Sequence, residues 1–232
     1  CDGTDVYIGG VMEHIEMAGI HSGDSACVLP SVNISEEHLA TIRDYTKRIA
    51  EAMHVRGLMN MQYAIENDVV YVLEANPRAS RTVPLVSKIC NIQMVPIATE
   101  VITMPLTGRP SPIPELEEKS YEYYGVKEAV LPFNMFPEVD PVLGPEMRST
   151  GEVLGLAKTF GEAFFKAQEA TQTVLPKGGK VLITVSNKDK DELPELARAL
   201  KDAGFDIYAT EGSAELIEAE GIAVERVKKL HE

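Results

Sequence analysis

Residues 58–76, Leu58-Met-Asn-Met-Gln-Tyr-Ala-Ile-Glu-Asn-Asp-Val-Val-Tyr-Val-Leu-Glu-Ala-Asn76, carry the clearest structural signal in the chain. Two runs rich in aliphatic, β-branched and aromatic residues, 58–65 and 70–74, flank Glu66-Asn-Asp-Val69, whose composition is typical of a hairpin turn. The pattern predicts two antiparallel β-strands joined by a short loop. Polar side chains collect at the far ends of both strands, where the surface of a sheet is usually apolar, and this end of the hairpin is therefore a candidate site.

The length of the hairpin loop decides which of these polar side chains share a face. A three-residue loop over 67–69 sets Gln62 opposite Glu74 and Asn60 opposite Asn76, whereas a two-residue loop puts the two pairs on opposite faces. We predict the three-residue loop, because only that register lets one metal ion contact all four side chains.

The residue types at this end of the hairpin are those of a nucleotide–metal site. Carboxylate and amide oxygens are hard ligands for Mg²⁺, which in turn bridges phosphate oxygens. The guanidinium groups of Arg78 and Arg81, just beyond the second strand, match phosphoryl or carboxylate oxygens. The alternative is a hairpin end with a solvated Glu74 and a strand stopped by Pro77.

Outward from the hairpin, the front of the chain mixes strands and helices. Ser35 is a typical N-cap, and the apolar residues that follow it at helical spacing predict an amphipathic covering helix; they are Leu39, Ile42, Ile49 and Met53. The other elements expected before residue 177 are strands at 5–14, broken by Gly9-Gly10, and at 26–29, helices at 82–90 and 94–104, strands at 124–133 and 151–157, and a helix at 161–169.

The end of the chain has a regular alternation. Strand, helix, strand, helix and strand are predicted in turn at 180–185, 191–203, 206–209, 214–220 and 222–226. This alternation indicates right-handed β-α-β units on a parallel sheet. The predicted fold class is α/β: an α+β part with an antiparallel sheet, followed by a partial, Rossmann-like part with a parallel sheet.

Two breaks divide the chain into three expected sections. The stretch Pro105–Lys119 holds four prolines, and Leu175-Pro-Lys-Gly-Gly179 forms a second break. We expect the sections 1–104, 105–176 and 177–232.

The composition argues against several classes of protein. The 232 residues carry 22 basic and 36 acidic side chains, a net charge of -14, so that neither nucleic acid nor an anionic membrane is an expected partner. No apolar run approaches the roughly 18 residues of a membrane span, and the first residues resemble neither a signal nor a transit peptide. Cys1, Cys27 and Cys90 have spacings typical of reduced thiols rather than of disulfides or a zinc site. We expect a cytoplasmic protein and, because the chain starts without Met, a piece of a longer one.

A second polar cluster runs from Glu13 to Ser25. Gly19 and Gly23 let backbone groups approach a ligand closely, and Glu16 and Asp24 offer carboxylates to a monovalent cation or an amine. The alternative is an ordinary turn rich in Gly and Ser.

A third cluster lies in the last section, where Lys190, Thr210 and Ser213 stand near predicted helix starts. Hydroxyls and backbone N–H groups at helix N-termini, close to a lysine, form a cradle for an anion. Generic helix capping is the alternative explanation.

Several long strings in the chain resemble the family of carbamoyl phosphate synthetase large subunits. Four strings resemble the C-terminal lobe of that family's ATP-grasp unit: His14–Ser25, Arg56–Asn60, Glu74–Thr82 and Pro84–Lys88. Two more resemble the segment after the second of its two synthetase units: Val130–Asn134 and Leu143–Val153. Residues 177 onward resemble the start of the methylglyoxal-synthase-like regulatory domain that follows. The resemblance covers essentially the whole chain and implies an internal segment: an ATP-grasp lobe at 1–104, a connecting segment at 105–176 and the first part of the regulatory domain at 177–232.

The resemblance implies a ligase that phosphorylates carbamate with ATP, giving carbamoyl phosphate and ADP for pyrimidine and arginine biosynthesis. It implies ATP, Mg²⁺ or Mn²⁺, and K⁺ as cofactors, and as partners the remainder of the large subunit and a glutaminase small subunit. Further ATP contacts of the family lie in lobes absent here, so the isolated chain is expected to show no synthetase or ATPase activity. The alternatives are another ATP-grasp ligase and a non-catalytic module that binds a regulatory effector.

The same resemblance implies roles for the residues of the hairpin and the loop. Gln62, Glu74 and Asn76 match ligands of Mg²⁺ and phosphate, and Arg78 and Arg81 match arginines that face the phosphates and the carboxylate-like substrate. His21 and Ser22 match positions beside the ribose of the nucleotide, and the stretch from His14 to Ser25, both ends included, matches a potassium-binding loop.

Effector positions are implied in the same way. Glu16, Asp24 and Glu128 match acidic residues that bind ornithine in some bacterial members. Lys190, Thr210 and Ser213 match positions that hold the phosphate of UMP or IMP, and Ser213 keeps the hydroxyl where the family has Thr.

Overall fold

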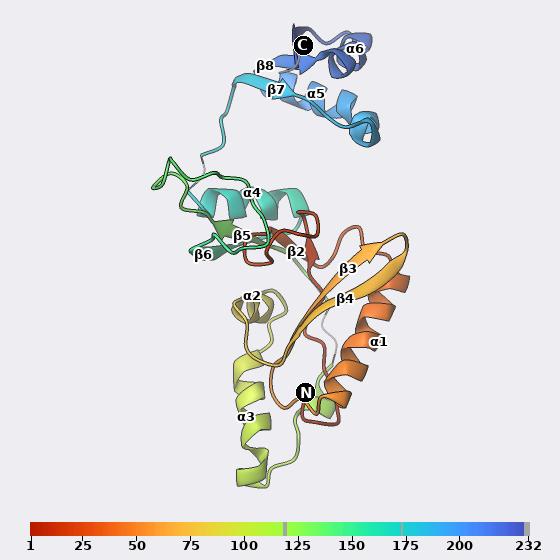
Figure 1. The fold of residues 1–232 in the computed structure, drawn as a ribbon, viewed down its shortest axis with the longest axis vertical. Helices are drawn as coiled ribbons and strands as arrows, with labels where there is room; N and C mark the ends of the chain where they lie inside the picture. The colour runs from red at the N-terminus through yellow and green to blue at the C-terminus, as the bar shows by residue number, and fades with distance from the viewer. Residues whose placement is uncertain (118–119, 173, 230–232) are drawn as a thin grey trace. The chain divides into compact units, whose positions relative to one another are not determined.

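The computed structural model of the chain divides into two compact units, Cys1–Thr173 and Val174–Glu232. It describes residues 1–117, 120–172 and 174–229, so the last two residues of the predicted connection at 105–119 lie outside the described part. Figure 1 labels the helices and strands of both units. The sheets of the first unit are antiparallel and that of the second unit is parallel, which confirms the predicted fold class.

A four-stranded antiparallel sheet lies in the first unit, in the order β1-β2-β5-β6. Its strands are β1 (Glu13–His14), β2 (Cys27–Leu29), β5 (Tyr124–Val130) and β6 (Gly151–Ala157). All three residues of β2 are buried: Val28 packs in a cluster with Ala163 and Ala167, and Leu29 in another with Val86 and Ile89. The sheet joins strands from the first two predicted sections, and the boundary expected between those sections near residue 104 stays a prediction.

The strand predicted at 5–14 is wrong except at its end, because only β1 has strand structure there. A Cβ added to Gly9 would lie 3.0 Å from Cε of Met94, and one added to Gly10 would lie 3.0 Å from Cδ2 of Leu29. The two glycines thus bring the backbone directly onto neighbouring side chains, an approach that residues with a Cβ would prevent.

Helix α4 (Phe160–Ala170) packs on this sheet through small residues (Figure 1). The Thr159 side chain caps the helix by accepting a hydrogen bond from the N–H of Glu162. A Cβ added to Gly155 of β6 would overlap the carbonyl oxygen of Ala163, which is itself fully buried. The helix and the strand therefore approach as closely as their backbones allow.

Strands β3 (Asn60–Glu66) and β4 (Val69–Asn76) form the predicted antiparallel hairpin. Its loop has two residues, so the predicted three-residue loop is wrong. Asn67 and Asp68 both have positive φ, 50° and 60°, which is the geometry of a type I′ turn. This turn matches the natural twist of the strands, and Asn and Asp tolerate its backbone conformation, which explains why the shorter loop forms.

A β-bulge in β4 restores the register that the longer loop was expected to give. Tyr63 pairs with Val72, but Gln62, the residue before it on β3, pairs with Glu74. Leu73 is therefore an extra residue on β4 with no partner in the ladder. The pairing of Gln62 with Glu74 is thus confirmed, and the bulge rather than the loop is its cause.

Helix α1 (Glu36–Ala52) runs along the hairpin, as Figure 1 shows. The predicted N-cap is confirmed, because the Ser35 side chain accepts a hydrogen bond from the N–H of His38. The hydroxyl oxygens of Thr46 on α1 and Tyr63 on β3 are 2.7 Å apart, and this hydrogen bond ties the helix to the hairpin.

Helices α2 (Thr82–Ile89) and α3 (Met94–Thr107) follow the hairpin, and a short 3-10 helix, η1 (Ile113–Glu115), comes after them. Helix α3 ends at Gly108, whose φ of 67° is left-handed. In the described part of the chain, no single helix is long and apolar enough to cross a membrane. Helices α2 and α3 have the required length and composition only as a pair, which is bent by 113°.

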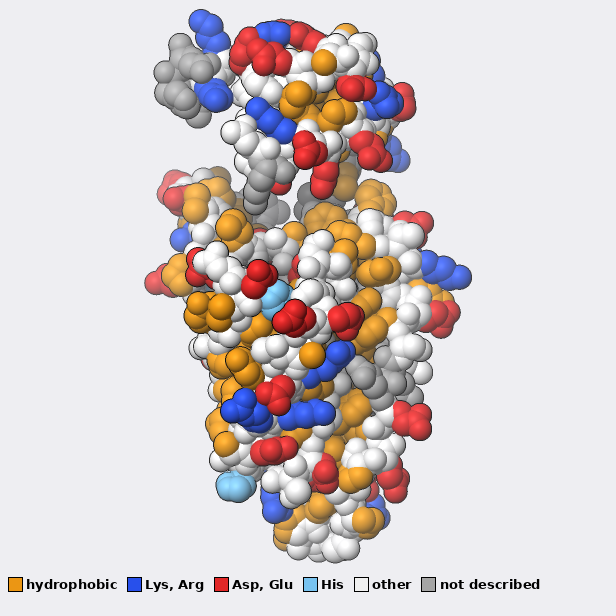
Figure 2. Space-filling view, turned by 90° about the vertical axis from the view of Figure 1, so that its right-hand side faces the viewer, with side chains coloured by type: hydrophobic (Ala, Val, Ile, Leu, Met, Phe, Trp, Pro, Cys, Tyr) orange, Lys and Arg blue, Asp and Glu red, His pale blue; other side chains and the backbone are white. Residues whose placement is uncertain are grey.

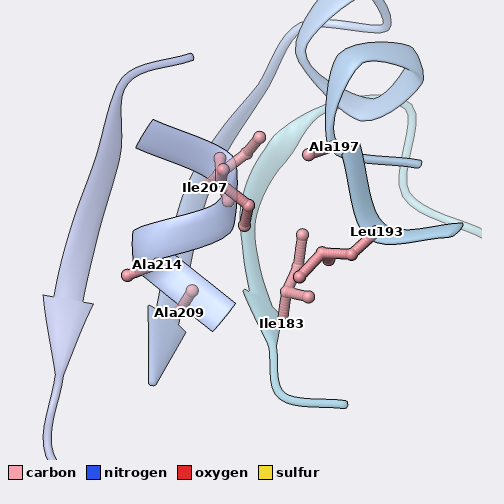
Figure 3. Close-up of a cluster of buried hydrophobic side chains, with 7 residues drawn as sticks. Ile183, Leu193, Ala197, Ile207, Ala209 and Ala214 are labelled. Carbon is pink, nitrogen blue, oxygen red and sulfur yellow. The ribbon is translucent and has the colours of Figure 1, made fainter. Parts of the chain in front are cut away.

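The second unit alternates strands and helices around a three-stranded parallel sheet, in the order β7-β8-β9. Its elements are β7 (Gly179–Ile183), η2 (Asn187–Glu192), α5 (Leu193–Asp202), β8 (Phe205–Thr210), α6 (Glu211–Ala219) and β9 (Val224–Val227). Aliphatic side chains from two strands and both helices form its core (Figure 3); they are Ile183, Leu193, Ala197, Ile207, Ala209, Ala214 and Ile217. Helix α6 starts before the predicted residue 214, because Thr210 is extended and takes the N-cap position.

Candidate functional site

Four polar side chains share one face at the open end of the β3–β4 hairpin. Residues opposite each other in an antiparallel ladder point to the same side, as do residues two apart along a strand. Gln62 is opposite Glu74 and Asn60 is opposite Asn76. Glu74 is exposed and the other three side chains are half-buried. One carboxylate and three amide groups can therefore meet a single ligand.

The donor set of this face fits a hard divalent cation that phosphate also binds. Mg²⁺ in nucleotide sites typically takes one or two carboxylates from the protein and completes its shell with phosphate oxygens and water. Over residues 1–117, 120–172 and 174–229, no group of three or more His, Cys, Asp and Glu side chains could hold a metal ion. A divalent cation at this face would thus depend on a bound phosphate chain.

A hydrogen bond joins this face to the second polar cluster. Nε2 of Gln62 donates to Oγ of Ser22 over 3.0 Å. Because the amide nitrogen is used in this way, the amide oxygen of Gln62 is left for a ligand. A cavity of about 530 Å³ is lined by Gln62 and Ser22 and also by Asn60, His14 and Glu16. The structure therefore brings together two clusters that lie far apart in the sequence.

Asp24 anchors the loop that carries Ser22. Its carboxylate is 1% exposed and accepts hydrogen bonds from the backbone N–H groups of Arg148, at 2.7 Å, and Ser149, at 2.8 Å. Burial alone would raise the pKa of Asp24, but hydrogen bonds from Ser149 and Arg148 outweigh it and the pKa is lowered. Both oxygens are engaged within the protein, which favours an anchoring role over the predicted contact with an effector.

His14, His21 and Ser25 lie on the same loop. Burial, followed by the positive charge of Lys127, lowers the pKa of His14, so that its ring is neutral at pH 7 and able to bind a cation. Nδ1 of His21 accepts a hydrogen bond from the N–H of Gly23 at 3.0 Å, and Oγ of Ser25 donates to the carbonyl of His21 at 3.4 Å. These short-range bonds are typical of a tight turn, and the potassium and ribose roles stay predictions.

The two arginines beyond β4 have different surroundings. Arg78 is exposed, and its Nη1 donates to the carbonyl of the adjacent Ala79. Arg81 donates to Oγ of Ser149 at 3.3 Å, and its Nε lies 3.9 Å from a carboxylate oxygen of Glu152. The guanidinium of Arg81 is therefore held by the segment that enters β6.

Lys127 is a residue of this region that sequence reasoning missed. It lies in β5, is 0% exposed, and its Nζ donates a hydrogen bond of 2.9 Å to the carbonyl of Ser22. The signal that could have found it is a lysine in the middle of an apolar strand, where a buried charge requires partners.

Glu16 and Glu128, the other positions predicted for ornithine, also have partners within the chain. Oε2 of Glu16 accepts a hydrogen bond from the N–H of Ala26, and Oε2 of Glu128 accepts one from the amide of Gln168, both at 2.6 Å. Burial raises the pKa of Glu128, and the nearby charge of Glu16 adds to that effect. Two neighbouring carboxylates of this kind attract an amine, and the ornithine role stays a prediction.

In the second unit, Lys190, Thr210 and Ser213 come together at the start of α6. Thr210 and Ser213 are buried, and Oγ1 of Thr210 donates to Oγ1 of Thr184 at 3.2 Å. A Cβ added to Gly212 would lie 3.2 Å from Nζ of Lys190, which places the ammonium beside the first turn of the helix. A lysine beside a helix N-terminus is an environment that favours an anion.

Two family models match the chain. A model described as "Carbamoyl-phosphate synthase L chain, ATP binding domain" matches residues 2–104, and one described as "MGS-like domain" matches residues 192–232.

Curated relatives match the chain over its whole length. The carbamoyl phosphate synthase large chain of Methanoculleus marisnigri is 50% identical over 231 residues, which are 100% of this chain and 22% of the relative. The large chain of Methanosarcina barkeri is 47% identical over 100% of this chain and 58% of the relative. The C-terminal section of the large chain of Methanocaldococcus jannaschii is 47% identical over 100% of this chain and 39% of the relative. The chain thus spans about a fifth of the Methanoculleus protein.

Proposed function

The chain belongs to the family of carbamoyl phosphate synthase large chains, as a segment with an ATP-grasp and an MGS-like domain, and we propose that its first unit holds the metal-bound phosphates of ATP while carbamate is phosphorylated. The observation that carries this proposal is the pairing of Gln62 with Glu74 and of Asn60 with Asn76 on one face, next to the cavity that Ser22 lines.

Phosphoryl transfer of this kind needs positioning and neutralisation of charge, and no covalent nucleophile from the protein. A carbamate oxygen forms a bond to the γ-phosphorus as the bond from that phosphorus to the β,γ-bridging oxygen breaks, and the bridging oxygen leaves with ADP. Glu74, Asn76 and Gln62 would hold a divalent cation, which would supply positive charge to the phosphate oxygens. The hydrogen bond from Gln62 to Ser22 keeps the amide oxygen turned toward that face.

The arginines neutralise the charge of the transferring group in this proposal. Arg78 is exposed and follows the end of β4 closely, so that it can reach the phosphates. Arg81 is held by Ser149 and Glu152, and it presents a guanidinium of fixed orientation to the carbamate. A charge that is oriented in advance stabilises the transition state without reorganisation during the reaction.

The loop from His14 to Ser25 serves the same nucleotide in this proposal. His21 and Ser22 lie beside the ribose, and the loop binds K⁺ through groups that include His14 and Ser25. The lowered pKa of His14 supports this role, because a neutral imidazole does not repel the ion.

A regulatory role is proposed for two further groups of residues. Lys190, Thr210 and Ser213 bind the phosphate of UMP or IMP, which the position of the lysine beside the first turn of α6 supports. Glu16 and Glu128 bind the amine of ornithine, which the mutual influence of their charges supports.

We also propose the setting in which the whole protein works. It acts in the cytoplasm with the remainder of the large chain and with a glutaminase small subunit, in pyrimidine and arginine biosynthesis. On the face drawn in Figure 2, acidic, basic and hydrophobic side chains are interspersed.

The reverse reaction tests the proposed step in the full-length parent large chain. Supplied with carbamoyl phosphate, ADP and Mg²⁺, the parent is expected to form ATP at a rate that falls to background when Mg²⁺ is removed. A parent chain that forms no ATP under these conditions would overturn the proposed function.

The second candidate is a non-catalytic module that binds an effector. The position of Lys190 beside Gly212 favours it, because an anion can bind there whatever the first unit does. Titration of this chain with UMP, IMP and ornithine, and separately with Mg-ATP, separates the two proposals. Binding of an effector together with a parent chain that forms no ATP favours the module.

A further inference from the structure

Lys127 is the largest fully buried side chain in the described part of the protein, and the mechanism above does not use it. Removing an ammonium from water is costly unless neighbouring groups compensate its charge. Its hydrogen bond goes to the carbonyl of Ser22, a residue of the nucleotide site, over 2.9 Å. A buried cation at this position therefore requires a compensating interaction, and the carbonyl of Ser22 provides one.

Glu128, next to Lys127 on β5, lies close enough for the two charges to interact. The charge of Lys127 opposes the rise in the pKa of Glu128 that burial causes. It also opposes the rise in the pKa of Cys27, which burial brings to about 12. The hydrogen bond of the ammonium goes to the loop carbonyl of Ser22.

Two hydrogen bonds converge on Ser22, one at its backbone and one at its side chain. Lys127 on β5 donates to the backbone carbonyl, and Gln62 on β3 donates to the side-chain hydroxyl at 3.0 Å. A displacement of Ser22 would therefore remove the acceptor of the Gln62 amide nitrogen, and the amide would be able to rotate. A rotated amide would turn its nitrogen instead of its oxygen toward the metal-bound phosphates.

We propose that Lys127 is a positioning residue of the nucleotide site: it holds the carbonyl of Ser22, so that the Ser22 hydroxyl orients the Gln62 amide oxygen toward the metal-bound phosphates. This inference rests on the proposed function of the first unit. It concerns a residue of β5 whose hydrogen bond goes to the loop backbone.

The rest of the loop has anchors that do not depend on Lys127. Asp24 accepts two backbone hydrogen bonds from Arg148 and Ser149, and Oγ of Ser149 donates to the carbonyl of Gly23 at 3.0 Å. Loss of the lysine is therefore expected to displace Ser22 locally and to leave the sheet folded.

The test replaces Lys127 in the full-length parent chain and separates binding from turnover. Lys127→Met keeps the unbranched apolar part of the side chain but removes the terminal ammonium, and with it the charge and the donor. In ATP formation from ADP and carbamoyl phosphate, the KM for Mg-ADP and the Mg²⁺ concentration for half-maximal rate are each expected to rise about tenfold, because loss of support behind a metal ligand typically weakens metal binding by 10- to 100-fold. The kcat is expected to change less than about threefold, since the arginines are untouched.

Two further variants make the test specific. Lys166→Met is the matched control, because Nζ of Lys166 also donates to a backbone carbonyl, that of Leu156, at 2.9 Å; its KM should equal that of the wild type. Ser22→Ala removes the acceptor of Gln62 directly. If Lys127 acts through Ser22, the double variant K127M/S22A should have a KM no higher than about twice that of the weaker-binding single variant, since coupled residues are not additive.

The outcomes separate this inference from the proposed function. An unchanged KM with a kcat lowered in proportion to the folded fraction would mean a purely structural role, and fully multiplicative effects in the double variant would exclude a path through Ser22; either result overturns the inference. If K127M does not fold, Lys127→Gln, which is shorter and keeps an N–H donor, is measured against the same criteria. Failure of the wild-type parent to form ATP would instead overturn the proposed function.

Discussion

At the scale of single residues, Glu74 provides the carboxylate of the paired face. Glu74→Gln keeps the shape of the side chain and removes the charge that a divalent cation needs, so the rate of ATP formation in the parent chain is expected to fall about 100-fold. The Mg²⁺ requirement should rise in parallel. Rates measured across a Mg²⁺ titration check both effects.

The control for this variant is Glu66→Gln. Glu66 is an exposed glutamate of the same hairpin, on β3, but it pairs with Val69 next to the turn. Its replacement should change the rate by less than about twofold, as is usual for exposed positions without partners at a site. A Glu74→Gln chain with the Mg²⁺ dependence of the wild type would show that the metal binds elsewhere.

The buried carboxylate of Asp24 leads to a prediction about how the stability of the chain depends on pH. Its pKa is lowered in the folded chain, so the stability that its ionised form contributes is present above the pKa of the unfolded state and is lost as the pH falls through the folded-state pKa. Asp24→Asn, which has one oxygen fewer to accept the two N–H groups, should lower the free energy of unfolding at pH 7 by about 2 kcal/mol.

The difference between the two proteins should shrink as the pH falls below about 4, where Asp24 begins to be protonated in the unfolded chain while it stays ionised in the folded one. Urea denaturation of both proteins at several pH values measures it. A difference that stays constant down to the most acidic pH would mean that the charge of Asp24 does not matter.

Residue-scale prediction worked where the signal was local and failed where it was not. The pairing of Gln62 with Glu74 was predicted within one hairpin, but from a three-residue loop; the two-residue loop and the bulge at Leu73 give the same pairing. Lys127 could not be predicted, because its partner Ser22 is 105 residues away in sequence and meets it only through the β2–β5 pairing. A single lysine in a strand does not reveal which loop it will contact.

At the scale of elements, the contact between α4 and β6 depends on Gly155. A Cβ there would overlap the carbonyl oxygen of Ala163 and lie within 3 Å of the backbone N of Ala167. Gly155→Ala should therefore lower the free energy of unfolding of the first unit by about 3 kcal/mol, the upper range for overpacking. Urea denaturation followed by circular dichroism measures the change.

Gly161 provides the matched control, because it lies in α4 and a Cβ there would meet nothing within 4 Å. Gly161→Ala should raise the stability by about 0.5 to 1 kcal/mol through helix propensity. Equal effects of the two substitutions would show that the close approach of helix and strand does not matter for folding.

The elements themselves were predictable where one short pattern determines them. Helix α1 begins after its predicted cap because the Ser35 hydroxyl satisfies a backbone N–H that the helix leaves unpaired. Most of the strand expected at 5–14 does not form, and its glycines instead lie against Met94 and Leu29, both distant in sequence. The predicted length of the hairpin loop was wrong for a third reason. The geometry of the turn favours a loop of two residues, and the bulge in β4 accommodates the one residue that remains.

At the scale of the whole molecule, the chain carries only part of a synthetase, since it spans 22% of the Methanoculleus relative. We expect the isolated chain to release no ADP above background from ATP and carbamate, because the hairpin face supplies one carboxylate and depends on other groups to hold the nucleotide. A coupled assay of ADP release, with the parent chain as the positive control, measures this.

ADP release that is lost in the Glu74→Gln chain would show that the segment is catalytically complete. Release that persists in that variant would indicate a contaminating ATPase. The division into two compact units agrees with separate ATP-binding and MGS-like parts, and the family resemblance that predicted these parts was carried by long strings rather than by single residues.

The extra residue in β4 changes the number of residues between Gln62 and Glu74 from even to odd. An odd count of residues, 63–73, separates the amide of Gln62 from the carboxylate of Glu74, whereas a tight turn with an unbroken ladder needs an even count between opposed positions. A chain lacking Leu73 would keep the two side chains opposed with no irregularity at all. In a related sequence that keeps the two-residue turn, counting the residues between these two positions therefore tells whether a kink must exist for the ligands to meet, before a single coordinate is known.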